Sequence, residues 1–335
     1  MNHATDSLSS ASPQHRETPG QPDGKHDDGI FTWLTTDAVI HVEGEDAADY
    51  LHSQFSSDIR NMNPGASLLT AYSDPRGRLL AIVRVLRPGE TEFLLVLDRG
   101  VVATIIAQLR KYALRARVTV TESTWSVAGI IGQAAADRLA ADGLPMATAE
   151  TEPVWSEGGT VSLRLPDEKP RWLLLGPRSS LAKGAAVLES SLHDDDAPAW
   201  RRREIETGMP RITATTSNRF VAQMVNLDRL GAVDFTKGCY PGQEVVARTH
   251  YLGRIKRRMF IVDISAGAPP AAGDGVYNAD GAAVGEIVTA AADGSASIAL
   301  AVLRLDAAAG ELRIGTADGP TGHAREPAYG LDHAV

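Results

Sequence analysis

Hydrophobic residues recur with two different spacings in the first part of the chain. Short apolar runs predict β-strands at residues 39–42, 68–72, 79–86, 93–97 and 118–120. Apolar residues three or four positions apart predict amphipathic helices at residues 46–55, with Asp46 as N-cap, and 101–112. Turn residues at 74–77 and 87–90 join neighbouring strands as hairpins.

A similar succession follows, with predicted strands at 126–131, 161–165 and 172–175. Helical spacing covers 134–139 and 181–192 and starts again near residue 197. Strands and helices alternate, but hairpins join the strands, which favours an α+β fold over a doubly wound parallel sheet. The absence of a G-x-G-x-x-G or Walker-type loop counts against a dinucleotide or P-loop enzyme.

After residue 258 the pattern changes to short strands separated by Gly, Pro and Asp turns, at 259–264, 284–289, 296–303 and 312–314. This pattern is typical of a small antiparallel β-barrel or sandwich. We therefore expect a disordered tail at 1–28 and an α+β core at 29–255, made of two units of about 29–122 and 123–255. A barrel at 256–317 and a loosely ordered tail at 318–335 complete the expected domains.

Composition narrows the class of protein. A single cysteine excludes a disulfide framework, predicts a reducing compartment such as the cytoplasm, and excludes a four-cysteine zinc or iron–sulfur site within one chain. We predict no metal site. The net charge of -9 argues against general nucleic-acid binding. No apolar run approaches the roughly 20 residues that span a bilayer, and the N-terminus lacks the apolar core of a secretory signal.

The lone Cys239 lies in the octapeptide 237–244, Lys-Gly-Cys-Tyr-Pro-Gly-Gln-Glu. Two glycines and a proline predict a tight turn whose backbone N–H groups can approach a ligand. The ammonium group of Lys237 would favour the thiolate form of Cys239. A buried, inert cysteine is the alternative, but the polar setting fits it poorly. His250 is the nearest candidate in sequence for a cysteine-protease pair, and nothing in the sequence fixes its position.

Upstream, Trp200 offers a flat stacking face, and Glu206 can accept hydrogen bonds from the N–H groups of a heterocycle. Packing of the indole and a solvated arginine face over 201–203 are the alternatives. A basic stretch over 248–258 is either a solvated strand edge or a receptor for an anionic ligand tail or RNA; its cations are Arg248, Arg254, Lys256, Arg257 and Arg258.

The octapeptide, followed by Ala247 and Arg248, resembles the signature of YgfZ-type folate-binding proteins. These proteins are relatives of the glycine-cleavage T-protein, an aminomethyltransferase. Weaker matches follow in the expected order between residues 39 and 314, at 44–47, 76–78, 111–112, 206–210 and 226–228.

The resemblance implies a two-unit T-protein-like core with a C-terminal barrel. It implies tetrahydrofolate or a one-carbon derivative in a central pocket, and iron–sulfur enzymes as partners, including those that thiolate tRNA. Cys239 matches the required cysteine of the family, with Lys237 beside it. The folate-binding residues implied are Trp200, Glu206, Tyr240, Gly242, Gln243, Glu244 and Arg248. A second family tryptophan is replaced by Asp37, with Trp33 close by, so either residue is a candidate to complete the pocket.

Aminomethyltransferases also need a carboxylate on the strand after the first glycine-rich turn, and residues 77–82 contain no acid. We therefore expect no aminomethyltransferase chemistry. Three functions stay open: a folate-binding accessory protein for iron–sulfur protein assembly or repair, a one-carbon or thiol-transfer enzyme with Cys239 as nucleophile, and a folate-independent module that docks onto client enzymes.

Overall fold

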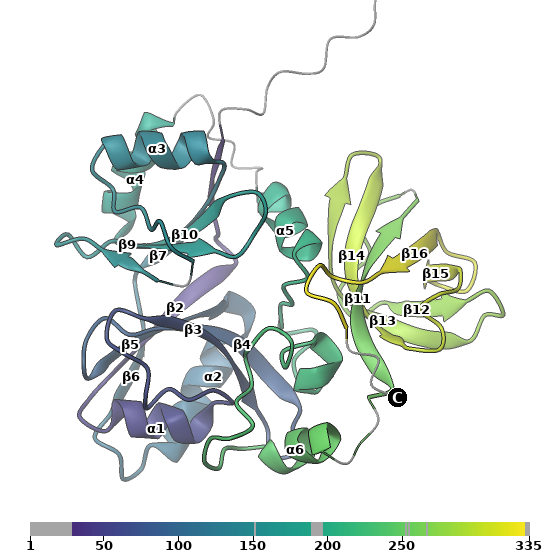
Figure 1. Ribbon diagram of the computed structural model, residues 1–335, viewed down its shortest axis with the longest axis horizontal. Coiled ribbons are helices and arrows are strands. Elements are labelled where there is room, and N and C mark those ends of the chain that lie inside the picture. The colour runs from purple at the N-terminus through teal and green to yellow at the C-terminus, as the bar shows by residue number, and fades with distance from the viewer. Residues whose placement is uncertain are drawn as a thin grey trace, which may run out of the picture.

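The computed structural model describes residues 29–150, 152–188, 197–251, 253, 255–265 and 267–331. The tail predicted over residues 1–28 and the cation Arg254 lie outside the described residues. Two α/β units stand one above the other, and a β-barrel lies beside them (Figure 1). None of the helices described is both long enough and apolar enough to cross a membrane.

The first unit is a sheet with two helices on one face. Its strand order is β3-β4-β5-β2-β6, and the strands are β2 Asp37–Glu43, β3 Ser67–Ser73, β4 Leu79–Leu86, β5 Glu92–Asp98 and β6 Thr119–Glu122. Helices α1 Ala47–Gln54 and α2 Arg99–Tyr112 cover the outer face. Side chains alternate along β4, so Val83 and Val85 pack toward these helices while Ile82 and Arg84 point to the opposite face.

The second unit repeats this layering. Its strand order is β1-β7-β10-β9-β8, and the strands are β1 Ile30–Trp33, β7 Ser126–Ile131, β8 Val154–Trp155, β9 Val161–Leu165 and β10 Arg171–Gly176. Helices α3 Gln133–Ala141 and α4 Arg178–Val187 pack on its outer face. Strand β1 is not among the strands predicted from the sequence; it crosses from the start of the first unit to pair with β7.

The inner faces of the two sheets meet in one apolar cluster, to which both units contribute. Helix α5 Ala197–Glu206 lies between the two units and the barrel (Figure 1). An irregular segment follows it and contains the short helix η2 Ala222–Val225 before α6 Gln243–Tyr251. Helix α6 is not among the predicted helices, and because Arg248 lies in it, the interpretation of this residue as part of a strand edge was wrong.

The C-terminal strands close into a barrel in the order β11-β14-β13-β12-β15-β16. They are β11 Arg257–Ile264, β12 Gly275–Asn278, β13 Ala283–Asp293, β14 Ala296–Arg304, β15 Leu312–Gly315 and β16 Thr321–Arg325. The predicted end of the barrel at residue 317 was too early, because β16 pairs with both β11 and β15. Its sequence lacks an apolar alternation, and Gly322 sits where a Cβ would come within 2.9 Å of Val262. Closure of the barrel, rather than a local pattern, defines this strand.

Candidate functional site

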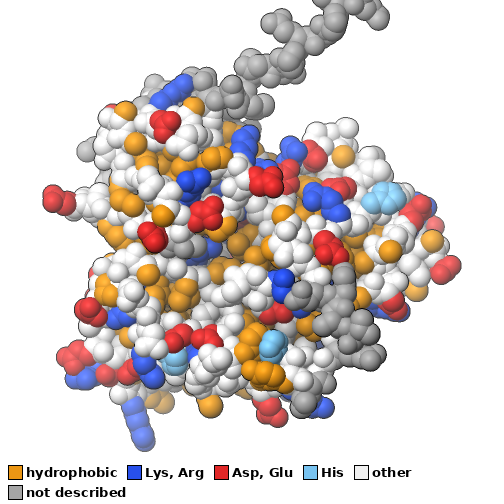
Figure 2. Space-filling model, viewed as in Figure 1, with side chains coloured by type: hydrophobic (Ala, Val, Ile, Leu, Met, Phe, Trp, Pro, Cys, Tyr) orange, Lys and Arg blue, Asp and Glu red, His pale blue; other side chains and the backbone are white. Residues whose placement is uncertain are grey.

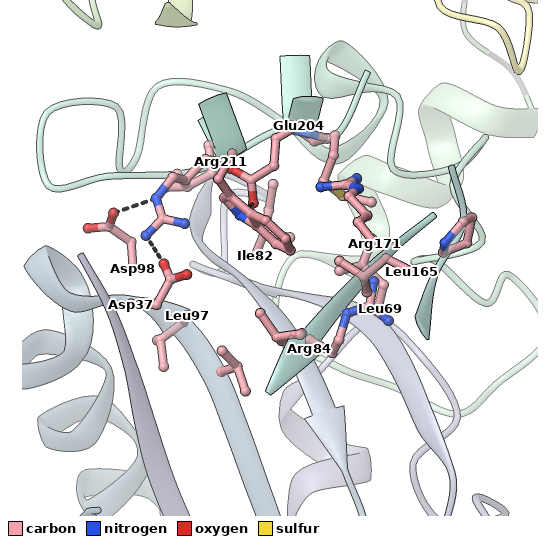
Figure 3. Close-up of a pocket in the computed structure, with 17 residues that line it drawn as sticks. Asp37, Leu69, Ile82, Arg84, Leu97, Asp98, Leu165, Arg171, Glu204 and Arg211 are labelled. Carbon is pink, nitrogen blue, oxygen red and sulfur yellow. Dashed lines mark hydrogen bonds and ion pairs between the residues drawn. The ribbon is translucent and has the colours of Figure 1, made fainter. Parts of the chain in front are cut away.

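A pocket lies between the inner faces of the two sheets and is bounded by α5 and residues 209–212 (Figure 3). Its walls are largely apolar, with Leu69 and Ile82 from the first sheet and Leu173 from the second. A few charged side chains reach it from both units and from α5. Apolar walls with a small number of polar groups are typical of pockets for organic ligands.

Trp200 lines this pocket from α5, as the folate-site prediction requires, but its indole is fully buried. The ring lies against Gly129 of β7, where an added Cβ would approach it to 2.4 Å. The guanidinium carbon of Arg171 is 5.1 Å from the ring centroid, and the indole N–H donates to Glu204 Oε1 at 3.1 Å. The indole therefore anchors α5 to the second sheet and offers a ligand little free surface.

The carboxylate that α5 presents to the pocket belongs to Glu204 and not to Glu206. Glu206 pairs instead with Arg202, at 3.0 Å, and with Arg203. Residues two apart on a helix point in nearly opposite directions, so the two carboxylates cannot share one face. Burial alone would raise the pKa of Glu204, but nearby arginines, Arg201 first among them, lower it and keep the group ionised.

One end of the pocket is closed by an ion-pair network. Arg211 donates to Asp98 at 2.7 Å and also to Asp37 (Figure 3). Arg201 lies 3.5 Å from Asp37. Asp37 thus completes this part of the pocket wall. Trp33 does not line the pocket; it packs edge-on against Phe31 and beneath the guanidinium of Arg178.

Cys239 is exposed, with a free thiol, in the loop before α6. The side chain of Lys237 is buried, and its ammonium donates to the backbone carbonyls of His52, Phe55 and Ser57 at the end of α1. Burial lowers the pKa of Lys237 to about 8. The ammonium of Lys237 therefore holds the loop on α1, and its predicted effect on the thiol of Cys239 stays a prediction.

The other residues predicted to bind folate do not line the pocket that contains Trp200. Tyr240 is buried, with the ammonium of Lys237 5.0 Å from its ring centroid. Gly242 packs on the β3–β4 turn. The remaining three lie on the half-exposed or exposed surface of α6 and are Gln243, Glu244 and Arg248. The structure therefore separates the pocket from the cysteine loop.

His250 stacks on Phe235 with ring centroids 3.8 Å apart, and nothing in the described part of the chain pairs it with the thiol. Among the described residues, no three His, Cys, Asp or Glu side chains gather in a way that could hold a metal ion. On the face shown in Figure 2, basic and acidic side chains alternate and do not form a basic stripe. This face gives no support to RNA binding through a broad positive surface.

Comparison with known proteins places the chain in a family. The "tRNA-modifying protein YgfZ" of Escherichia coli O157:H7 (strain EC4115 / EHEC) is 31% identical over 250 residues, which cover 73% of this chain and 75% of the relative. This chain belongs to the YgfZ family. The YgfZ protein of Colwellia psychrerythraea (strain 34H / ATCC BAA-681) is 29% identical over 232 residues, or 69% of this chain and 70% of that protein.

Two further likenesses confirm the predicted architecture of this YgfZ-family chain. Residues 256–328 match the family model "CAF17, C-terminal beta-barrel domain". The glycine cleavage system aminomethyltransferase T from Bartonella henselae superposes with a TM-score of 0.74 at 16% identity, covering 91% of this chain and 87% of the other. At that identity the likeness shows the fold alone, and it confirms an α+β core of the T-protein type.

Proposed function

We propose that this YgfZ-family protein has a role linked to tRNA modification, and that it acts as a folate-binding accessory factor for iron–sulfur enzymes. The observation that carries the proposal is the match to proteins named as tRNA-modifying over most of the chain. The T-protein-like core supports a folate-related ligand in the pocket between the sheets. A cytoplasmic location stays a prediction.

The pocket residues fit a folate. Apolar side chains such as Leu69, Ile82 and Leu173 suit the flat faces of a pterin ring. The ionised carboxylate of Glu204 can accept hydrogen bonds from the N–H edge of the ring. Trp200 would contribute to the pocket wall without stacking its buried indole face on the ligand. When bound, the folate would supply one-carbon chemistry, while these side chains would hold and orient it.

Cys239 is the second part of the proposal. Its thiol is exposed, and the loop that carries it is anchored at Lys237 and packed at Gly242. A single cysteine cannot hold a cluster unaided, so we propose that it acts jointly with a client enzyme, by ligating iron or by thiol exchange. The exposed side chains of Val245 and Tyr251 on α6 give a client a partly apolar surface to contact.

Calorimetry with tetrahydrofolate tests the pocket. We expect the wild type to bind and Glu204→Gln to bind about tenfold more weakly, because a charge-assisted hydrogen bond is lost. Glu206→Gln is the matched control, since its carboxylate pairs with surface arginines, and it should bind as the wild type does. Equal affinities of all three folded proteins would show that Glu204 does not bind the ligand. A wild type that does not bind tetrahydrofolate would contradict the folate proposal itself.

Complementation of a deletion strain tests Cys239. We expect Cys239→Ser to melt and bind folate normally, yet to fail to restore iron–sulfur enzyme activity and thiolated tRNA. Full complementation would leave only a folate-binding scaffold. Turnover with a folate donor that depends on Cys239 would favour the thiol- or one-carbon-transfer enzyme. Client capture independent of folate would favour the docking module.

A further inference from the structure

The pocket side of β4 carries a cation two residues after the stretch in which an aminomethyltransferase is expected to carry an acid. In β4, Ile82 and Arg84 are two residues apart and therefore share the face that lines the pocket. Ile82 ends the stretch, residues 77–82, that lacks the carboxylate expected of an aminomethyltransferase. The pocket side of β4 thus offers an apolar group followed by a guanidinium.

Arg84 has no acceptor for its guanidinium group among the described residues. Its side chain is half-buried, and burial, followed by repulsion from Arg171, lowers its pKa to about 10. Asp37 and Asp98 lie at the other end of the pocket, where Arg211 engages both of them (Figure 3). Glu204 pairs with Arg201, and its charge also acts on Arg171. Arg84 therefore remains charged at neutral pH and unpaired.

Arg171 from β10 reaches the same end of the pocket and is 1% exposed (Figure 3). Its Nε lies 2.8 Å from Oδ2 of Asp167, and its Nη2 donates to the hydroxyl of Thr207 at 3.0 Å. Its Nη1 is buried and finds no acceptor in the described part of the chain. Buried donors are satisfied in most native structures, so an orphan donor beside an unpaired cation indicates a missing acceptor.

We propose that Arg84 and Arg171 form an oxyanion subsite that holds a carboxylate of the pocket ligand. The two parallel N–H groups of a guanidinium match the two oxygens of a carboxylate. A cationic amine would be repelled by the arginines, and the apolar side chain of Ile82 offers it no hydrogen-bond acceptor. Naming the carboxylate as that of the glutamate part of a folate rests on the proposed function. The subsite would place the acidic end of the ligand at Arg84 and the heterocycle toward Glu204.

Three probes separate the two ends of the ligand: tetrahydrofolate, p-aminobenzoylglutamate, and 6-methyltetrahydropterin, which lacks the acidic part. We expect Arg84→Met to weaken the binding of the first two by about tenfold or more and to leave the pterin unchanged. Arg84→Lys should weaken them less, because it keeps the charge but loses the fork. Arg325→Met, on the barrel surface, is the control and should change none of them.

The outcomes distinguish this subsite from the proposed function. If Arg84→Met binds tetrahydrofolate as the wild type does, the subsite is overturned. It is also overturned if Arg84→Met weakens the binding of tetrahydrofolate and of the pterin equally. Neither result contradicts the proposal that the wild type binds folate. Binding of p-aminobenzoylglutamate that depends on Arg84, without binding of either pterin compound, supports the subsite and removes the folate proposal. If no probe binds to the wild type, both fail. Melting curves of each variant exclude loss of fold as the cause.

Discussion

Gly242 lies against Gly77 so closely that a Cβ on Gly242 would come within 2.6 Å of the Cα of Gly77. Both residues have positive φ, +84° and +73°. The contact packs the start of α6 on the β3–β4 turn. The sequence predicted that the glycines of the octapeptide let a ligand approach the backbone, but at Gly242 it is the chain's own turn that approaches.

We predict that Gly242→Ala lowers the free energy of unfolding by about 2 kcal/mol or more, through left-handed strain and the clash with Gly77. Gly65 is a matched control, because its φ of +83° is nearly the same and nothing lies within 4 Å of an added Cβ. Gly65→Ala should cost only about 1 kcal/mol, the strain alone. Urea unfolding measures both. Equal losses would show that the contact with Gly77 is unimportant.

Lys237→Met is expected to lower stability by roughly 2 kcal/mol, because three carbonyls at the end of α1 lose a charged donor. The rate at which iodoacetamide alkylates Cys239 should not fall, since the ammonium is directed to α1. Lys111→Met, at an exposed lysine on α2, is the control for stability. A slower alkylation with unchanged stability would restore the activating role that the sequence suggested.

We also predict no folate-dependent release of ammonia from an aminomethyl-lipoyl carrier. The pocket side of β4 presents Ile82 and Arg84, neither of which can accept a proton from the substrate amine at neutral pH. The assay compares the protein with a T-protein under the same conditions. Turnover at a similar rate would show that another group in the pocket performs this step.

The sequence predicted most elements of the two α/β units, because their strands and helices bury one face and show it in their spacing. It missed β1 and β16, whose pairing partners lie far away in the chain, at β7 and at β11. It also missed β8, in which neither residue is buried, β12, in which only Val276 is buried, and α6, in which only Val246 is buried. Elements specified by long-range pairing or by a single buried residue leave little periodic signal.

The candidate site shows the same limit. The resemblance identified Trp200, which lines the pocket, but it selected Glu206, and the helix turns that side chain away. Lys237 appeared to be next to Cys239 because the two are neighbours in sequence, whereas its amine reaches α1. Whether Arg84 finds an acceptor among the described residues depends on the side chains of every element around the pocket, so no pattern along the sequence could have indicated it.

The last prediction concerns His52, which is 7% exposed and lies 3.0 Å from Asp58 through Nδ1. Burial lowers the pKa of His52, Lys237 and Arg60 lower it further, and Asp58 opposes them without reversing the shift. The unfolded chain, with a histidine pKa near 6.5, therefore binds this proton more readily than the folded one. The lowered pKa of His52 in the folded protein therefore contributes to the unfolding free energy above about pH 6.5, and this contribution is lost as the pH falls further.

We expect the difference in unfolding free energy between pH 7.5 and pH 5.5 to be smaller in His52→Gln than in the wild type. The difference should be unchanged in His323→Gln, whose side chain is exposed. Urea titrations at the two pH values measure it, and an equal loss in His52→Gln would place the acid sensitivity elsewhere.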